Sequence, residues 1–185
     1  MIVWLARHGE AAWPPGSALG WADPPLSLVG EGQARALAER LARRPIAAVH
    51  SSDLRRALAT AEAVASPHRL SVELTPDLQE LGFGAWEGRE LKDLWRERPD
   101  EAREWEADVR RTPASFAESV PELERRVAGF AAALRAAAAG QCQEVAVVAH
   151  RGSLAALHAA LTGADFGSSF RRRHFDLASE VQVRC

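Results

Sequence analysis

The chain has 185 residues, of which 47% are hydrophobic and 26% charged, as in globular proteins and unlike disordered or fibrous ones. Its formal net charge is -2 with both signs interspersed, which argues against a nucleic-acid-binding surface, and no apolar run approaches the roughly 18 residues of a membrane span. The N-terminus lacks the pattern of a signal peptide, and two cysteines, Cys142 and Cys185, are too few for a disulfide framework. We therefore expect a single cytoplasmic domain over residues 1–185.

Strand-like and helix-like segments alternate along the first half of the chain. Residues 2–6 read as a buried strand, and Gly and Pro turn residues 13–25 into a long ordered loop, a kind of segment that often carries function. Ser27 is a candidate N-cap for a helix that ends before Pro45. A second strand at residues 46–50 leads into another helix. The apolar face of that helix consists of Leu54, Ala57, Leu58, Ala61 and Val64.

The second half is less regular at first. Residues 71–74 are a short strand candidate, and helical segments are expected between residues 90 and 110. A long Ala-rich helix is predicted over residues 119–139, closed by Gly140. The strongest strand of the chain, residues 144–150, follows this helix and passes directly into another one.

The last residues, 174–184, alternate enough to supply one or two edge strands, with an antiparallel direction as one alternative. Together the alternating strands and helices predict an α/β layered domain with a largely parallel sheet.

Three of the predicted strands end at polar residues. The first ends at Arg7 and His8, the second in the turn before Arg56, and the third at His150. Ligands of parallel sheets bind beyond the carboxyl ends of the strands. These four side chains are therefore expected to converge at one edge of the sheet.

The convergent residues favour an anion site, because buried charges without partners are strongly unfavourable. The planar guanidinium groups of Arg7 and Arg56 match phosphate oxygens. Helix N-termini near Arg56 and after Gly152 add backbone N–H groups, and Gly9 leaves room for the backbone to approach a phosphate.

A histidine at such a site has two alternative roles. As a neutral imidazole it attacks phosphorus and forms a phosphohistidine, whereas as a cation it holds the transferring oxygens. The leaving oxygen also needs an acid, and Glu80, in a Gly-punctuated loop, is the candidate. Partial burial and a nearby anionic phosphate favour the protonated form of this carboxyl.

Structural interpretations compete with these roles. Arg55 and Arg56 are compatible with a solvated helix face, and Glu10 and Glu87 with local ion pairs. Three tryptophans are compatible with pocket walls as well as with substrate stacking: Trp13, Trp21 and Trp86. Four further histidines are expected to be structural or exposed: His50, His68, His158 and His174.

Five sequence blocks occur in a characteristic order: LARHGE, LSLVGEGQA, SSDLRRALATAE, LQELGFGAWEGR and VVAHRGSL. In this order the chain resembles the histidine phosphatase superfamily, the phosphoglycerate mutase-like proteins, over most of its length. It is most similar to the branch that holds α-ribazole phosphatases, fructose-2,6-bisphosphatase domains and broad-specificity phosphatases. The segment FAESVPELERRV resembles a GES…R segment of the phosphatases, with Ala117 where Gly is usual.

The resemblance implies a three-layer α/β/α sandwich with a mostly parallel central sheet and a phosphohistidine intermediate. It implies that His8 is the nucleophile and that Glu80 is the general acid. It further implies that Arg7, Arg56 and His150 hold the phosphoryl group.

The chain departs from the family pattern around this site. Ala11 and Pro14 stand where the family usually has Ser or Thr and Asn, so two polar contacts are missing. After the second histidine the family usually has Gly-Gly and soon an Arg, whereas this chain has Arg151-Gly152 and then Ala155. Arg151 either binds an anion from the opposite side of the pocket or points into solvent.

We therefore expect a metal-independent phosphomonoester hydrolase of the histidine acid phosphatase type, without a cofactor. Its expected substrate is a small phosphomonoester, with α-ribazole-5'-phosphate as one candidate, and neither nucleic acid nor a membrane is expected as a partner. The oligomeric state stays open, with a dimer as one alternative. Three other functions stay open: a mutase, a non-catalytic phosphate-binding protein, and a phosphoprotein phosphatase whose pocket mouth is framed by residues 13–25.

Overall fold

The computed structural model describes residues 1–137, 143–171 and 175–184. The predicted helix end at Gly140 lies outside the described residues, as do Cys142, His174 and Cys185.

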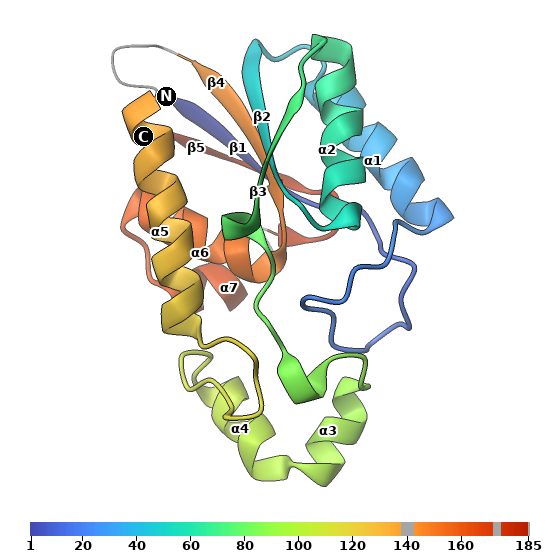
Figure 1. Cartoon of the computed structure of the whole chain (residues 1–185), viewed down its shortest axis with the longest axis vertical. Coiled ribbons are helices and arrows are strands. Elements are labelled where there is room, and N and C mark those ends of the chain that lie inside the picture. Colours follow the sequence, from blue (N-terminus) through green and yellow to red (C-terminus); the bar gives the residue numbers. More distant parts are fainter. Residues whose placement is uncertain (138–142, 172–174, 185) are drawn as a thin grey trace.

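A five-stranded sheet with the order β3-β2-β4-β1-β5 forms the centre of the molecule (Figure 1). Its strands are β1 (Ile2–Arg7), β2 (Ile46–Ser52), β3 (Val72–Thr75), β4 (Glu144–Ala149) and β5 (Glu180–Arg184). All neighbouring pairs are parallel except β1 and β5, which are antiparallel. The sequence EVAVVA of β4 is buried from its second residue on, as expected of a central parallel strand covered on both faces. The predicted mostly parallel sheet and the antiparallel C-terminal edge strand are confirmed.

Helices cover both faces of the sheet. On one face lie α1 (Leu28–Leu41) and α2 (Arg55–Ala65), and on the other lie α5 (Val120–Ala137) and α6 (Arg151–Thr162) (Figure 1). Each pair shares its own cluster of buried apolar side chains with the sheet. The three-layer α/β/α architecture is thereby confirmed.

Local sequence signals set the helix ends. The Ser27 hydroxyl accepts a hydrogen bond from the Gly30 amide, so Ser27 is the N-cap of α1, as predicted. The segment predicted to be helical between residues 90 and 110 contains two helices, α3 (Leu91–Glu97) and α4 (Pro99–Ala107). They are separate because Pro99 has no N–H and restricts the backbone of Arg98 before it.

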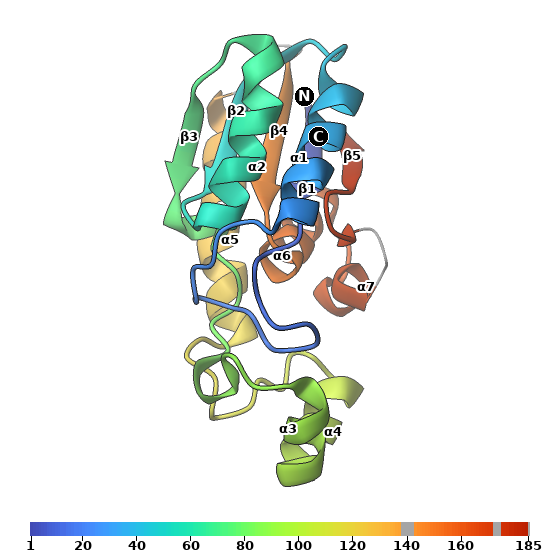
Figure 2. The same cartoon turned by 90° about the vertical axis from the view of Figure 1, so that its right-hand side faces the viewer.

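The remaining elements are short. They are α7 (Phe166–Arg171) and three 3₁₀ turns, η1 (Ser66–His68), η2 (Pro76–Leu78) and η3 (Gly84–Trp86). Figure 2 shows that α3, α4 and the loop between β1 and α1 lie beyond the carboxyl ends of the parallel strands. Among the described helices, none has the length and the apolar character needed to cross a membrane.

Candidate active site

Two histidines meet at the carboxyl edge of the sheet. His8 follows β1 and His150 follows β4, and these strands are parallel neighbours with Arg7 opposite Ala149. The two imidazole rings therefore lie with their centroids 4.9 Å apart, tilted by 58°. The convergence of these residues, which are 142 positions apart, follows from the strand order, as predicted.

His8 is held in one tautomer. Its Nδ1 lies 2.6 Å from the Gly9 carbonyl oxygen, which only accepts hydrogen bonds, so Nδ1 carries the proton and Nε2 has a free lone pair. The ring is 4% exposed. Burial, and then the positive charges of Arg7 and Arg56, hold the pKa of His8 well below its ordinary value. His8 is therefore neutral in the unliganded site.

Gly9, the residue after His8, lies where there is no space for a side chain. A Cβ on Gly9 would lie 2.4 Å from the backbone oxygen of Gly30, at the start of α1. The Gly9 amide donates to the Thr60 hydroxyl at 3.1 Å and is thus already bound within the protein. The predicted role of Gly9 in phosphate binding gains no support from this geometry.

The two arginines, fully buried Arg56 and partly buried Arg7, have no acidic partner among the described residues. Arg56 is fully buried, and its terminal nitrogens donate to the carbonyls of Ala22 and Gly20, each at 2.7 Å. One terminal nitrogen of Arg7 donates to the carbonyl of Phe175 at 3.1 Å. Over the described residues, no carboxylate lies within 4.0 Å of either guanidinium, and both buried Nε atoms have no hydrogen-bond partner. The solvated-face interpretation is therefore wrong for Arg56 and right only for the exposed Arg55.

Glu80 lies at the N-terminus of α6. Its Oε1 accepts the amides of Leu81 and Gly152, both at 2.9 Å, and the side chain is 7% exposed in total. Burial raises the pKa of this carboxyl, although the Leu81 amide and the charges of Arg7 and Arg56 oppose the shift. A group that holds its proton above the ordinary range of a carboxyl suits an acid that protonates a leaving oxygen.

His150 is fully buried, and its Nε2 lies 2.9 Å from the hydroxyl of Ser52 at the end of β2. Burial, and then Arg56, His8 and Arg7, lower its pKa well below the ordinary value. Its Nδ1 has no hydrogen-bond partner within the described part of the chain. The ring therefore has one nitrogen available to a ligand, while Ser52, which the sequence analysis did not single out, orients the other.

A clamp centred on Arg126, which holds the backbone at Glu80, was not predicted from the sequence. Arg126 binds Glu118 through two hydrogen bonds of 2.7 and 2.8 Å. The same guanidinium donates to the backbone carbonyls of Asp77 at 2.7 Å and Glu80 at 3.0 Å. The Trp21 indole N–H donates to the Glu80 carbonyl as well, at 2.9 Å. The segment FAESVPELERRV contains both charged partners of this clamp and was the available signal for it.

Within the described part of the chain, Glu10 and Glu87 do not form the ion pairs considered for them. Glu10 accepts a hydrogen bond from the Ser27 hydroxyl at 2.6 Å. Glu87 accepts the amides of Gly20 and Ala22 at 2.8 and 3.0 Å, the same two residues whose carbonyls bind Arg56. Glu87 thus stabilises the loop that holds Arg56.

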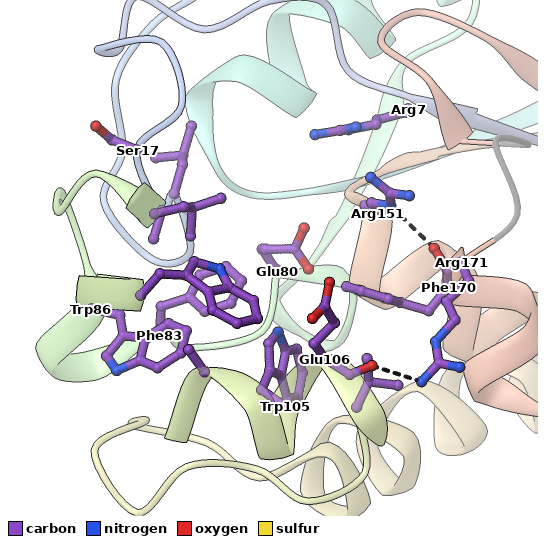
Figure 3. A pocket seen from close by; sticks show the side chains of 16 residues that line it. Arg7, Ser17, Glu80, Phe83, Trp86, Trp105, Glu106, Arg151, Phe170 and Arg171 are labelled. Carbon is purple, nitrogen blue, oxygen red and sulfur yellow. Dashed lines mark hydrogen bonds between the residues drawn. The ribbon is translucent and has the colours of Figure 1, made fainter. Parts of the chain in front are cut away.

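A pocket of about 510 Å³ opens beside Arg7 and Glu80 (Figure 3). Its walls are largely apolar. The apolar lining consists of Ala18, Leu19, Phe83, Trp86, Leu91, Trp95, Ala102, Trp105, Val109 and Phe170. Ser17, Ala18 and Leu19 come from the long loop over residues 13–25, which frames the pocket as considered from the sequence. Trp86 is a wall residue with 3% exposure, while the indole of Trp13 donates to the Ala18 carbonyl.

Arg151, Glu106 and Arg171 add charge to this pocket. Arg151 is half-buried, and its Nε donates to the Phe170 carbonyl at 3.1 Å. The side chain of Arg151 therefore does not point only into solvent, which was one of the two alternatives considered for it. Ala155, by contrast, is fully buried in the apolar core.

Two of the other histidines have polar side chains as local partners. His50 Nδ1 lies 3.3 Å from Glu73, and His158 Nδ1 lies 3.0 Å from the Ser169 hydroxyl. In the described ranges, no group of three or more His, Cys, Asp and Glu side chains is placed to hold a metal ion. The metal independence of the reaction stays a prediction.

Comparison with known proteins yields matches over most of the chain. The sequence model of the histidine phosphatase superfamily (branch 1) matches residues 3–185. Phosphoserine phosphatase 1 of Hydrogenobacter thermophilus is 32% identical over 87% of this chain and 76% of its own length. The adenosylcobalamin/α-ribazole phosphatase of Salmonella typhimurium is 35% identical over 87% of this chain and 79% of its own length. The crystal structure of the α-ribazole phosphatase from Shigella flexneri superposes with a TM-score of 0.84 at 32% identity, covering 100% of this chain and 90% of that one. These similarities support a phosphatase function.

Proposed function

The chain belongs to the histidine phosphatase superfamily, and from this membership we propose that it hydrolyses small phosphomonoesters through a phosphohistidine at His8, as a phosphatase of the histidine acid phosphatase type. One observation carries the proposal. A buried, neutral imidazole lies beside the guanidinium groups of fully buried Arg56 and partly buried Arg7, and neither guanidinium has a carboxylate within 4.0 Å among the described residues. A neutral nucleophile beside an anion-binding pocket is the arrangement that phosphoryl transfer to histidine requires.

In the first step, Nε2 of His8 attacks phosphorus. The P–N bond forms while the bond from phosphorus to the leaving oxygen breaks. Glu80 gives its proton to the leaving oxygen, so the product leaves as a neutral alcohol and Glu80 becomes a carboxylate. Gly9 keeps the Nδ1 proton in place through its carbonyl, which stabilises the imidazolium character of the phosphorylated ring.

In the second step, the Glu80 carboxylate takes a proton from water, and the water oxygen attacks phosphorus. The P–N bond breaks and His8 returns to its neutral form. The charge on the transferring phosphoryl oxygens is stabilised throughout by Arg7 and Arg56, and the His150 ring lies beside the His8 ring, with centroids 4.9 Å apart. Because the two guanidinium groups are already oriented by backbone carbonyls, little reorganisation is needed during the reaction.

Phosphate release from 4-nitrophenyl phosphate in the presence of EDTA tests the proposal. The native protein is compared with His8→Ala and with His68→Ala, a histidine variant distant from the pocket. We expect turnover by the native protein and by His68→Ala, loss of turnover in His8→Ala, and an acid-labile phosphorylated protein after rapid quenching. The proposal would be overturned by a native protein that binds inorganic phosphate but neither releases phosphate from 4-nitrophenyl phosphate nor becomes phosphorylated.

The same assay ranks substrates. α-Ribazole-5'-phosphate and phosphoserine belong in the panel, because relatives of this chain bear the names of phosphatases for α-ribazole and phosphoserine. Turnover that requires a bisphosphorylated compound would instead favour the mutase alternative.

A further inference from the structure

Arg151 is held rigidly at the wall of the pocket. It is the first residue of α6, directly after His150. Its Nε donates to the Phe170 carbonyl, and its guanidinium carbon lies 5.4 Å from the centroid of the Phe170 ring. Figure 3 shows the guanidinium on the side of the pocket toward which Arg7 and Glu80 also point. Both terminal nitrogens are therefore oriented by α7, and among the described residues neither donates a hydrogen bond within the protein, which leaves them to a ligand.

The charge of Arg151 is not balanced by a neighbouring acid. In the described part of the protein, no carboxylate lies within 4.0 Å of this guanidinium. Its proximity to Arg7 contributes, after burial, to lowering the pKa of Arg7. Among the described residues, the pocket lining contains three arginines and two glutamates. A pocket with this excess of positive charge favours an anion beyond the one that Arg7 and Arg56 bind.

The position of Arg151 differs from that of three of the four residues proposed to hold the transferring phosphoryl group. His8, Arg56 and His150 are at most 4% exposed and are outside the pocket lining, whereas Arg7 belongs to the lining and lies at the border between the two groups. Arg151 belongs to the lining, together with the aromatic side chains that would surround a leaving group. The guanidinium of Arg151 therefore lies on the side of the site that the leaving group would occupy.

We propose that Arg151 is a specificity-determining residue that binds a second anionic group, a carboxylate or a phosphate, on the leaving group of the substrate. The inference rests on the proposed phosphatase function and names its substrate class: phosphomonoesters with an additional negative charge attached to an apolar or planar body. The forked guanidinium recognises either anion through paired N–H···O hydrogen bonds.

A matched pair of substrates tests the inference. 4-Carboxyphenyl phosphate and 4-carbamoylphenyl phosphate have nearly the same shape, and only the first carries the second charge. 3-Carboxyphenyl phosphate and 3-carbamoylphenyl phosphate are measured in parallel, because they place the second group at a different distance from the phosphoryl group. The readout is the ratio of kcat/KM between the charged and the neutral substrate, compared among the native protein, Arg151→Gln and Arg151→Lys.

We expect Arg151→Gln to lower this ratio by about tenfold or more for at least one pair, since hydrogen bonds to charged groups contribute that much. Arg151→Lys should retain part of the ratio, because it keeps the charge and loses the fork. Arg171→Gln is the matched control. Arg171 lines the same pocket, but one of its terminal nitrogens already donates to the carbonyls of Glu106 and Ala107. This variant should keep most of the native ratio.

Three results would overturn the inference. Equal losses on both substrates in Arg151→Gln would mean that Arg151 binds the transferring phosphoryl group. Unchanged kcat/KM values for both substrates in Arg151→Gln would mean that it binds no anion, and an equal fall of the ratio in Arg171→Gln would mean that the general charge of the pocket discriminates. If the native protein cleaves neither ester, the proposed function fails, and calorimetric binding of the same esters to the native protein and to Arg151→Gln decides the inference separately. Thermal unfolding of each variant verifies that it is folded.

Discussion

The Gly152 amide donates a hydrogen bond to Glu80 Oε1 at 2.9 Å, and a Cβ on residue 152 would lie 2.4 Å from that same oxygen. The glycine therefore both holds the carboxyl and leaves the space in which it lies. Glu80 is a side chain from the loop after η2, whereas Gly152 belongs to α6, and their contact joins the two sides of the proposed active site. The position of the proposed acid thus depends on a residue without a side chain.

The first prediction concerns this contact. Gly152→Ala should displace the Glu80 carboxyl and lower kcat for alkyl phosphates by about 100-fold, the lower part of the range over which acid catalysis accelerates such reactions. Steady-state kinetics measures the effect. Gly129→Ala is the control, since no atom lies within 4 Å of a Cβ at this exposed position of α5, and it should leave kcat unchanged. Equal activities of the two variants would contradict the positioning role of Gly152.

The second prediction concerns the chemistry of Glu80. Glu80→Gln keeps the shape of the side chain but cannot protonate a leaving oxygen. Its kcat/KM should fall by about 100-fold or more for alkyl phosphates and much less for 4-nitrophenyl phosphate, because nitrophenolate leaves without a proton. The dependence of log kcat/KM on the pKa of the leaving group measures this difference. The same slope for Glu80→Gln and the native protein would show that Glu80 is not the acid.

The third prediction is the pH dependence of kcat/KM. His8 must be neutral, and its pKa lies well below the ordinary value of about 6.5 for histidine, so activity should decline only in strongly acidic solution. Glu80 must be protonated, and its pKa is raised, so activity should decline as the pH rises through that value. The profile is therefore a bell whose maximum lies between the pKa values of the two groups.

Glu80→Gln provides the test of this assignment, because glutamine does not titrate. The alkaline limb of the bell should disappear in this variant while the acidic limb stays. Rates of phosphate release from an alkyl phosphate, whose leaving oxygen needs the proton, distinguish the two limbs from pH 3 to pH 9 (roughly the range over which His and Glu titrate). An alkaline limb that persists in Glu80→Gln would assign it to another group.

The fourth prediction concerns the clamp of Arg126 on Glu118. Arg126→Met leaves the buried Glu118 carboxylate unpaired and should lower the free energy of unfolding by about 3 kcal/mol. It also removes one of the two side-chain hydrogen bonds to the Glu80 carbonyl, so kcat should fall as well. Arg110→Met is the control: its pair with Glu124 is largely exposed and should contribute about 0.5 kcal/mol. Urea unfolding measures both, and similar losses in the two variants would contradict the prediction.

The amino-acid sequence determines the elements and their order through local signals. Apolar runs ending at Arg7 and at His150 predict strands, and Ser27 predicts a helix start. Once the sheet is parallel, its strand ends share an edge, so the meeting of His8 with His150 was predictable as well. These features depend on periodicity and on residue type over a few positions, which the sequence displays directly.

The tertiary structure decided which partner each polar group finds. Glu87 binds backbone amides of Gly20 and Ala22, where the sequence allowed an ion pair, and Gly152 accommodates Glu80 from 72 positions earlier in the chain. The orientation of Arg151 depends likewise on the Phe170 carbonyl of another helix. Backbone amides and carbonyls occur at almost every residue, so nothing in the sequence distinguishes the one that will meet a given side chain. Only the packing of distant segments against one another selects it.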